Sequence, residues 1–253
     1  MFLGELNMLS EKEIDRYSRQ LPIIGLEGQQ KLKKSTVVIV GVGGLGSAAS
    51  YYLAASGIGK LILIDNGLVE ESNLQRQILY TVNDIGKPKV EVAAERLRLL
   101  NPYIEIIPVN EFFDENVAMK YFRVADVVVD ALDNWEGRLV IDKIAHKLGK
   151  PFIHAGVHGF YGQLTVIIPK KTPCLKCIFP KKPSYTVSPL PIIPTTPGVL
   201  GVLEANEALK ILLGKGEIFA NKLLVYDGLT GMFEVLKLSM SPDCPVCTEY
   251  YEK

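Results

Sequence analysis

Five short runs of aliphatic and β-branched residues recur in the first 155 positions, each separated from the next by a longer segment. The first run, residues 36–40, is apolar at all positions but one, which is the pattern of a parallel strand buried on both faces. The others are residues 60–65, 104–109, 126–131 and 151–154. Strands that alternate with helices predict a mainly parallel sheet with right-handed crossovers and helices on both faces.

Helices are predicted before, between and after these runs, at residues 10–34, 47–56, 88–100, 136–148 and 198–213, with a short helix between the third and fourth strands. Ser10 and Glu13 have the spacing of a capping box. A break is expected around residues 22–25 because Pro22 and Gly25 interrupt the first helix. Pro88 suits the first turn of its helix.

After residue 155 the alternation weakens into a strand at 163–168, a loop at 169–197 and a closing hairpin of 222–226 with 232–238. The chain after the loop is too short to bury its own core, so we expect one domain over residues 1–253. Its parts are an N-terminal helical segment (10–34), a nucleotide-binding core (35–155), the crossover loop region (169–197) and a C-terminal hairpin with half of a metal site (222–253). The predicted fold class is α/β and Rossmann-like, with antiparallel strands toward the C-terminal side.

Composition and charge narrow the function classes. Hydrophobic residues make up 48% of the chain and charged residues 22%, with a formal net charge of zero. This balance gives no electrostatic argument for binding nucleic acid or an anionic membrane. The N-terminus has no basic segment followed by an apolar run, and the apolar runs are too short to span a bilayer. The sequence therefore predicts a cytoplasmic protein with no membrane partner.

A glycine pattern follows the first predicted strand directly. Residues 41–46 read Gly-Val-Gly-Gly-Leu-Gly, so Gly41, Gly43, Gly44 and Gly46 let the backbone turn tightly and approach phosphate oxygens. The helix N-terminus behind them supplies free N–H groups. Asp65 ends the next strand, where a carboxylate can bond ribose hydroxyls. The pattern predicts a nucleotide site, although the alternative of a tight turn without a ligand stays open, and so does NAD.

Charged residues favour ATP over NAD. Hydride transfer by a dehydrogenase needs no cluster of cations, whereas attack on an α-phosphate builds negative charge that Arg, Lys and Mg²⁺ neutralise. Arg76 and Lys89 lie between Asp65 and the next helix, and Asp133 follows the fourth strand, where it can hold magnesium. Each has an ordinary alternative: a surface ion pair for Arg76, a solvated helix face for Lys89 and a helix cap for Asp133.

Several motifs occur together in one order: Arg16-Tyr-Ser-Arg19-Gln20, the glycine loop, Asp65, Asn73-Leu-Gln-Arg-Gln77, Gly86-Lys-Pro-Lys89 and Asp133-Asn-x-x-x-Arg138. With them the chain resembles the ubiquitin-activating-enzyme-like adenylyltransferases of the MoeB/ThiF/HesA family, from about residue 10 to 248. The combination is specific although each motif alone is weak.

The resemblance implies roles for individual residues. Asp65 would bind the ribose, Asn73, Arg76 and Lys89 the phosphates, and Asp133 a magnesium ion. Gln77 and Asn134 belong to the same motifs, and we expect them to contact the cofactor as well. Members of the family form homodimers in which an arginine, here Arg19, enters the ATP site of the partner subunit.

The four cysteines form two Cys-x-x-Cys pairs, Cys174 with Cys177 and Cys244 with Cys247. Two such pairs brought together present four thiolates, which suit structural Zn²⁺, and the family resemblance agrees. The alternative is a pair of redox dithiols, which normally sit at helix N-termini, whereas both pairs here lie in stretches predicted as loops. Zinc at this site would join the 169–197 region to the C-terminal tail.

Several relatives carry a further cysteine before Pro197 that bonds the activated protein, and the stretch 185–194 has none. The resemblance implies ATP-dependent adenylation of the C-terminal glycine of a small ubiquitin-like sulfur carrier of the MoaD or ThiS type, ending in Gly-Gly. Pyrophosphate would be released, no enzyme thioester would form, and a separate sulfur donor would act afterwards. A tRNA or peptide acceptor and a non-catalytic nucleotide-binding scaffold remain alternatives.

The three histidines give weaker signals. His146 lies on a predicted helix and is interpreted as structural. His154 and His158 flank Gly156 near the carboxyl edge of the sheet, where they are candidates for the substrate cleft. A lining role is favoured over a general base because a carboxylate nucleophile is already ionised.

Overall fold

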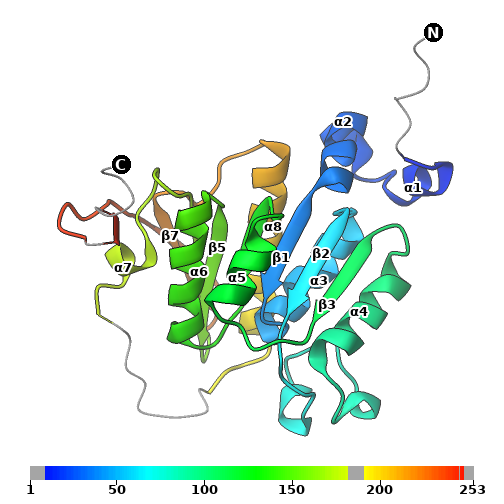
Figure 1. Ribbon diagram of the computed structural model, residues 1–253, viewed down its shortest axis with the longest axis horizontal. Coiled ribbons are helices and arrows are strands. Elements are labelled where there is room, and N and C mark those ends of the chain that lie inside the picture. The colour runs from blue at the N-terminus through cyan, green and yellow to red at the C-terminus, as the bar shows by residue number, and fades with distance from the viewer. Residues whose placement is uncertain (1–8, 182–190, 245, 248–253) are drawn as a thin grey trace.

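The structure is a computed structural model, and it describes residues 9–181, 191–244 and 246–247. An eight-stranded sheet runs through it in the order β3-β2-β1-β4-β5-β6-β7-β8 (Figure 1). The parallel strands are β1 (Thr36–Val40), β2 (Lys60–Ile64), β3 (Glu105–Val109), β4 (Val127–Asp130) and β5 (Phe152–His158). The antiparallel strands β6 (Tyr161–Ile167), β7 (Lys222–Asp227) and β8 (Met232–Lys237) complete it. The predicted fold class is confirmed.

Helices cover both faces of this sheet. They are α1 (Glu11–Arg16), α2 (Leu21–Lys34), α3 (Gly44–Ser56), α4 (Lys89–Leu100), α5 (Glu115–Phe122), α6 (Trp135–Leu148), α7 (Leu175–Ile178) and α8 (Thr195–Leu213). Two 3-10 turns, η1 (Glu71–Asn73) and η2 (Val82–Asp84), lie between β2 and α4. In Figure 1, α5 and α6 lie in front of the sheet and α8 behind it.

Strand β1 shows why the first half of the chain folds this way. Val37 and Ile39 pack into the core layer shared with α3, α4 and α8, whereas Val38 and Val40 pack into the layer shared with α5 and α6. All four side chains are fully buried. Apolar residues at successive positions therefore serve both layers, because successive side chains of a strand point to opposite faces.

The N-terminal helices close the amino end of the sheet. The predicted capping box is present, with Glu13 N–H donating to Ser10 Oγ at 3.3 Å and Ser10 N–H to Glu13 Oε2 at 2.9 Å. The expected break is also present, because Gly25 has a φ of 75° inside α2. A Cβ on Gly59 would lie 1.8 Å from Lys33 O, so the turn into β2 needs glycine there.

Some predicted boundaries are wrong. Helix α3 begins at Gly44 and not at Ser47, and α8 begins at Thr195 and not at Gly198. Glycine and the Thr-Thr-Pro segment are poor helix formers, but each occupies a first turn, where propensity matters least. Strand β5 extends past residue 154 because pairing with β6 in a hairpin keeps it extended. The short helix α7 lies in a region predicted as loop.

Among the described residues, no helix has the length and apolar character needed to cross a membrane.

Candidate functional site

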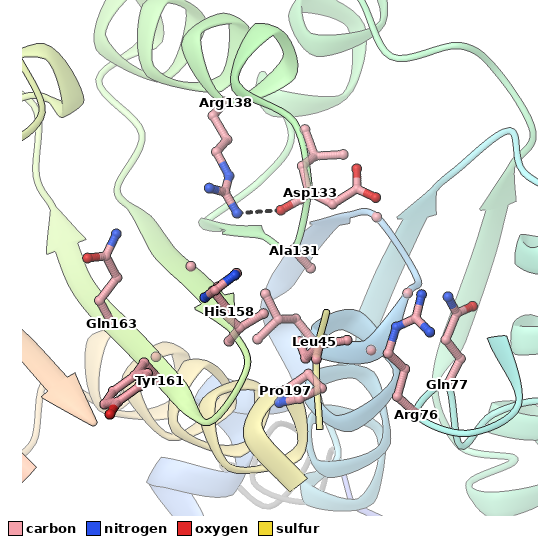
Figure 2. Close-up of a pocket in the computed structure, with 18 of the residues that line it drawn as sticks. Leu45, Arg76, Gln77, Ala131, Asp133, Arg138, His158, Tyr161, Gln163 and Pro197 are labelled. Carbon is pink, nitrogen blue, oxygen red and sulfur yellow. Dashed lines mark hydrogen bonds between the residues drawn. The ribbon is translucent and has the colours of Figure 1, made fainter. Parts of the chain in front are cut away.

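A cavity of about 590 Å³ opens at the carboxyl ends of β1 and β4 and extends to β5 and β6. Strand order reverses between β1 and β4, and the crevice at such a point is where ligands of open α/β sheets bind. Eight of the predicted site residues line the cavity: Gly41, Gly43, Gly44, Asp65, Arg76, Gln77, Lys89 and Asp133. They come from segments far apart in sequence. Figure 2 shows Arg76 and Gln77 on one side and Gln163 and Tyr161 on the other.

The glycine loop is shaped by contacts between backbones. Gly41 has a φ of 92°, and a Cβ on it would lie 2.6 Å from Ala131 O. A Cβ on Gly46 would lie 2.0 Å from Gly41 O. Helix α3 begins after Gly43 without a side-chain cap, so N–H groups of its first turn face the cavity rim unpaired by a capping side chain. This arrangement suits a phosphate.

Asp65 and Tyr80 hold the loop in place. Asp65 Oδ2 accepts a hydrogen bond from Val42 N–H at 2.9 Å, and Oδ1 accepts one from Gly67 N–H at 2.7 Å. Tyr80 donates its hydroxyl hydrogen to Val42 O at 2.8 Å, and burial raises the pKa of Tyr80 well above its usual range, so it stays a donor. A carboxylate has about four lone-pair sites, so Asp65 can still accept from ribose hydroxyls.

Lys89 is positioned by a loop that Asp84 organises. Buried Asp84 accepts hydrogen bonds from Thr81 N–H at 2.9 Å and Arg96 Nη2 at 3.0 Å, and pairs with Lys87 Nζ at 3.2 Å. Lys89 N–H donates to Gly67 O at 3.0 Å. A Cβ on Gly67 would meet Asp65 Oδ1 at 3.0 Å and Lys89 Nζ at 3.4 Å, so the lysine and this carboxylate border the same space.

Asp133 is exposed at the cavity and does not cap α6. The cap is Asn134, whose Oδ1 accepts a hydrogen bond from Gly137 N–H at 2.9 Å. The alternative explanation of Asp133 as a helix cap is therefore wrong. Its carboxylate stands at the rim, and one carboxylate beside the phosphates of a nucleotide is a usual set of ligands for Mg²⁺.

Arg138 lines the cavity. It belongs to the Asp133-Asn-x-x-x-Arg138 motif but is not among the predicted site residues. Its Nη2 donates to Leu132 O at 2.5 Å and to Ala155 O at 3.1 Å, which ties the carboxyl end of β4 to β5 (Figure 2). Its Nε lies 3.9 Å from Oδ2 of the fully buried Asp130. His154 Nδ1 is 2.7 Å from the same oxygen.

Of the two histidines predicted for the cleft, one lines the cavity and the other does not. His158 lines the cavity as expected, together with Tyr161 and Gln163, which sequence reasoning missed. His154 is fully buried and does not line it, so the prediction that it lies in the cleft is wrong. Burial lowers the pKa of His154 more than its hydrogen bond to Asp130 raises it. Its ring is therefore a neutral donor inside the protein.

Four of the residues predicted for the nucleotide site do not line this cavity: Arg19, Gly46, Asn73 and Asn134. Arg19 is exposed between α1 and α2, at the amino end of the sheet and away from the cavity. Asn73 is buried, and its Oδ1 accepts a hydrogen bond from Glu70 N–H at 3.1 Å in η1. Gly46 and Asn134 shape the first turns of α3 and α6.

The four cysteines come together near the C-terminal end of the described chain. Their Sγ atoms all lie within 4.8 Å of one another, with 3.6 Å between Cys174 and Cys244 and 3.3 Å between Cys177 and Cys247. Tetrahedral zinc with Zn–S bonds of about 2.3 Å separates its sulfurs by about 3.8 Å, whereas disulfide sulfurs lie about 2 Å apart. The cluster therefore fits a tetrahedral metal.

The prediction that both pairs lie in loops is wrong, because Cys174 directly precedes α7, Cys177 lies within it and Cys247 is also helical. The N-terminus of a helix is a position where redox dithiols occur, but here a second pair completes the set of thiols. The segment that carries the first cysteine pair also contacts α6 and β5. Leu175 N–H donates to Asp142 Oδ1 at 3.3 Å, and the Phe179 ring lies 5.7 Å from that of His154.

Comparisons with known proteins agree with this geometry. The model of the ThiF family matches residues 17–246. The SAMP-activating enzyme E1 of Haloferax volcanii is 40% identical over 95% of this chain and 91% of its own length. The sulfur carrier protein adenylyltransferase of Thermus thermophilus is 41% identical over 94% of this chain and 92% of its own length.

Solved structures of MccB, among them the E. coli protein with ATP, have the same fold. The complex with ATP has a TM-score of 0.81 and the complex with N-formylated MccA one of 0.83. In both, 28% of the aligned residues are identical, and the alignment covers 92% of this chain and 74% of the other.

The Asp84 network gives a prediction about stability. Burial raises the pKa of Asp84, but the hydrogen bonds from Thr81 and Arg96 outweigh it and hold that pKa well below its usual range. A lowered folded-state pKa stabilises the fold above the unfolded value of about 3.9, and this contribution is lost as pH falls below it. We expect Asp84→Asn to lower the free energy of unfolding by about 1–3 kcal/mol at pH 7.

Urea unfolding at pH 7 and at several values below pH 4 measures this difference, which should shrink as the pH falls. Asp15→Asn, at an exposed position, is the matched control. A loss of stability that is the same at every pH would contradict the argument.

Proposed function

Because the chain belongs to the ThiF family, we propose that it adenylates the C-terminal carboxylate of a small ubiquitin-like sulfur carrier, using ATP. One observation carries the proposal: the glycine loop and Asp65 share a single cavity with Arg76, Lys89 and Asp133. The names of the relatives from Haloferax and Thermus support the same activity and acceptor class. A dehydrogenase would leave these cations without a role.

In the reaction, an oxygen of the acceptor carboxylate forms a bond to the α-phosphorus of ATP. The bond from that phosphorus to the pyrophosphate oxygen breaks, and the electron pair leaves with pyrophosphate. The products are an acyl-adenylate and pyrophosphate. No general base is required, because a C-terminal carboxylate with a pKa of about 3.5 is ionised at neutral pH.

The chain's own residues bind and orient the nucleotide. Asp65 accepts hydrogen bonds from the ribose, and the N–H groups at the start of α3 face the phosphates. Arg76 and Lys89 neutralise charge that grows on the α-phosphoryl group and pyrophosphate, with Gln77 beside them at the glycine loop. Asn73 and Asn134 contribute by fixing the backbone next to Arg76 and Asp133. Asp133 holds Mg²⁺, which when bound adds positive charge at the phosphates.

Arg19 acts in this scheme from the partner subunit of a homodimer. Its distance from the cavity of its own chain, at the opposite end of the sheet, supports an action in trans. Each of the two sites would then combine the cavity of one chain with Arg19 of the other. A twofold dimer satisfies this requirement, since it repeats each contact between the two chains.

The acceptor is a protein tail ending in Gly-Gly. All four cysteines of the chain are in the cluster, so none is left to form a thioester with the activated tail. The acyl-adenylate is therefore the end product, and a separate sulfur donor takes it over. The prediction drawn from the stretch 185–194 concerns residues of which 185–190 lie outside the described part of the chain. A cytoplasmic location stays a prediction.

A peptide acceptor is the second candidate, and the structurally similar MccB was solved in complex with N-formylated MccA. A tRNA acceptor and a scaffold without turnover are further alternatives, distinguished by the assay below. The cysteine cluster holds zinc in this proposal. Four thiolates leave no open coordination position, so the metal has a structural role.

The function is tested by ATP–pyrophosphate exchange. We expect exchange that depends on a carrier ending in Gly-Gly and does not occur with tRNA or with a short peptide. Asp133→Ala should reduce it by about 100-fold or more, because the phosphate charge loses its magnesium ligand. The thermal midpoint should not change, since the side chain is exposed. Exchange without any carrier, or full activity of Asp133→Ala, would be evidence against this assignment.

The role of Arg19 is tested by mixing two inactive variants. Arg19→Ala and Asp133→Ala should each lack activity, but an equimolar mixture that exchanges subunits should recover about a quarter of the wild-type activity. Half of the dimers would be mixed, and one site of each mixed dimer would be intact. A mixture as inactive as its components would mean that Arg19 does not act across subunits.

Metal analysis tests the cysteine cluster. Purified protein should contain about one zinc ion per chain, and Cys177→Ser should lower both the zinc content and the thermal midpoint. Exposed Ser18→Ala serves as a control that alters neither. Fully folded protein without metal would refute the zinc assignment.

A further inference from the structure

Two nitrogen donors converge on the space above Gly156, at the β5–β6 side of the cavity. Gly156 in β5 pairs directly with Gln163 in β6. A Cβ on Gly156 would lie 3.1 Å from Gln163 Nε2 and 3.7 Å from Arg138 Nη1. All three residues line the cavity. The missing side chain therefore leaves a space that an amide and a guanidinium nitrogen both border.

The guanidinium of Arg138 is fixed so that one of its nitrogens remains for a ligand. Nη2 is used by Leu132 O and Ala155 O, and Nε faces Asp130 inside the protein. Only 7% of the side chain is exposed. Within the part of the chain that the structure describes, Nη1 forms no hydrogen bond. Figure 2 shows Arg138, His158 and Gln163 on the side of the cavity away from Arg76 and Gln77.

The positive charge of Arg138 is compensated by a carboxylate on the side of the guanidinium that faces the protein interior. Asp130 is fully buried and receives a hydrogen bond from the neutral ring of His154. Glu204 is also fully buried, and burial together with Asp130 raises its pKa well above the usual range, so it stays neutral. One carboxylate thus compensates the guanidinium, and Nη1 remains a charged donor at the cavity surface. A charged donor binds carboxylates more strongly than a neutral one.

We propose that Arg138 and Gln163 bind the reacting C-terminal carboxylate of the acceptor in the space above Gly156. One carboxylate oxygen is held by the two nitrogens, and the other is left to attack the α-phosphorus. This inference rests on the proposed adenylation. It goes beyond that function by assigning the acceptor subsite, and it restricts acceptors to those with a free C-terminal carboxylate.

The subsite acts mainly on acceptor binding. The carboxylate is charged in the ground state and loses that charge when the acyl-adenylate forms, so the contact to Arg138 is strongest before the reaction. Removing such a contact raises KM for the acceptor more than it lowers kcat. The nucleotide is held on the other side of the cavity by Asp65, Arg76 and Lys89, and its affinity should not change.

Gly156→Ala is the most direct test, because the added methyl group fills the space and leaves every charge in place. The backbone accepts alanine here, since the φ of Gly156 is not positive. We expect the KM for a sulfur carrier ending in Gly-Gly to rise about tenfold. The affinity for ATP with Mg²⁺, measured by calorimetry without a carrier, should stay within about twofold.

Gln163→Glu is the second variant, and it keeps the inference testable should Gly156→Ala fail to fold. It replaces the amide nitrogen with a negative oxygen, so the carrier KM should rise more than in the isosteric control Gln163→Met. Arg123→Gln, which removes an exposed arginine elsewhere, should leave both constants unchanged. Wild-type protein should bind a carrier with a free C-terminus and not the same carrier with a C-terminal amide.

The outcomes separate the two proposals. Wild-type protein without carrier-dependent exchange would overturn the adenylation and the subsite together. Normal exchange combined with an unchanged carrier KM in Gly156→Ala and Gln163→Glu would overturn the subsite alone. An equal loss of ATP affinity in both variants would also overturn the subsite. Gly156 and Gln163 would then affect nucleotide binding, through the segment around Asp133, and not only acceptor binding.

Discussion

The site depends on a close contact between two backbones where β1 and β4 end. The carbonyl of Ala131 occupies the space that a Cβ on Gly41 would need, and the carbonyl of Gly41 does the same to Gly46. No rotamer change can relieve such contacts, because backbone atoms form both sides. A side chain at either glycine would push the strand ends apart. Strand order also reverses between β1 and β4, so the crevice in which ligands bind lies directly beside this backbone contact.

Buried carboxylates set the positions of the cations around this crevice. Asp84 fixes the loop that leads to Lys89 by binding Thr81 and Arg96, and Asp130 compensates Arg138 from inside the sheet. Neither carboxylate lines the cavity. The backbone at Lys89 and the guanidinium of Arg138 are therefore in place before any ligand arrives, so little reorganisation is needed when they meet a charged ligand. Preorganisation of this kind is a large source of electrostatic catalysis in enzymes.

Sequence reasoning placed Gly41, Asp65 and Lys89 together at the cavity correctly but missed Gln163, for a physical reason. Gly41, Asp65 and Lys89 lie at the ends of elements whose apolar pattern is visible locally, so their meeting at one sheet edge follows from the parallel topology. Gln163 reaches the cavity beside Gly156 only because β6 pairs with β5 in a register that places the two residues opposite each other. No local sequence pattern encodes that register. His154 was misplaced because its position near the carboxyl edge of the sheet suggested the cleft, whereas Asp130 provides it with a buried partner.

The proposed acceptor subsite is the part of the site that the cysteine cluster supports. Phe179, just after α7, packs against both Trp135 and His154, at ring distances of 5.3 and 5.7 Å. His154 in turn orients Asp130, on which the charge balance of Arg138 depends. Among the described residues, the glycine loop, Asp65 and the Asp84 network are held by hydrogen bonds of their own, none of which involves Phe179. A metal ion bound by the four thiols would thus stabilise the proposed acceptor subsite through Phe179 and His154.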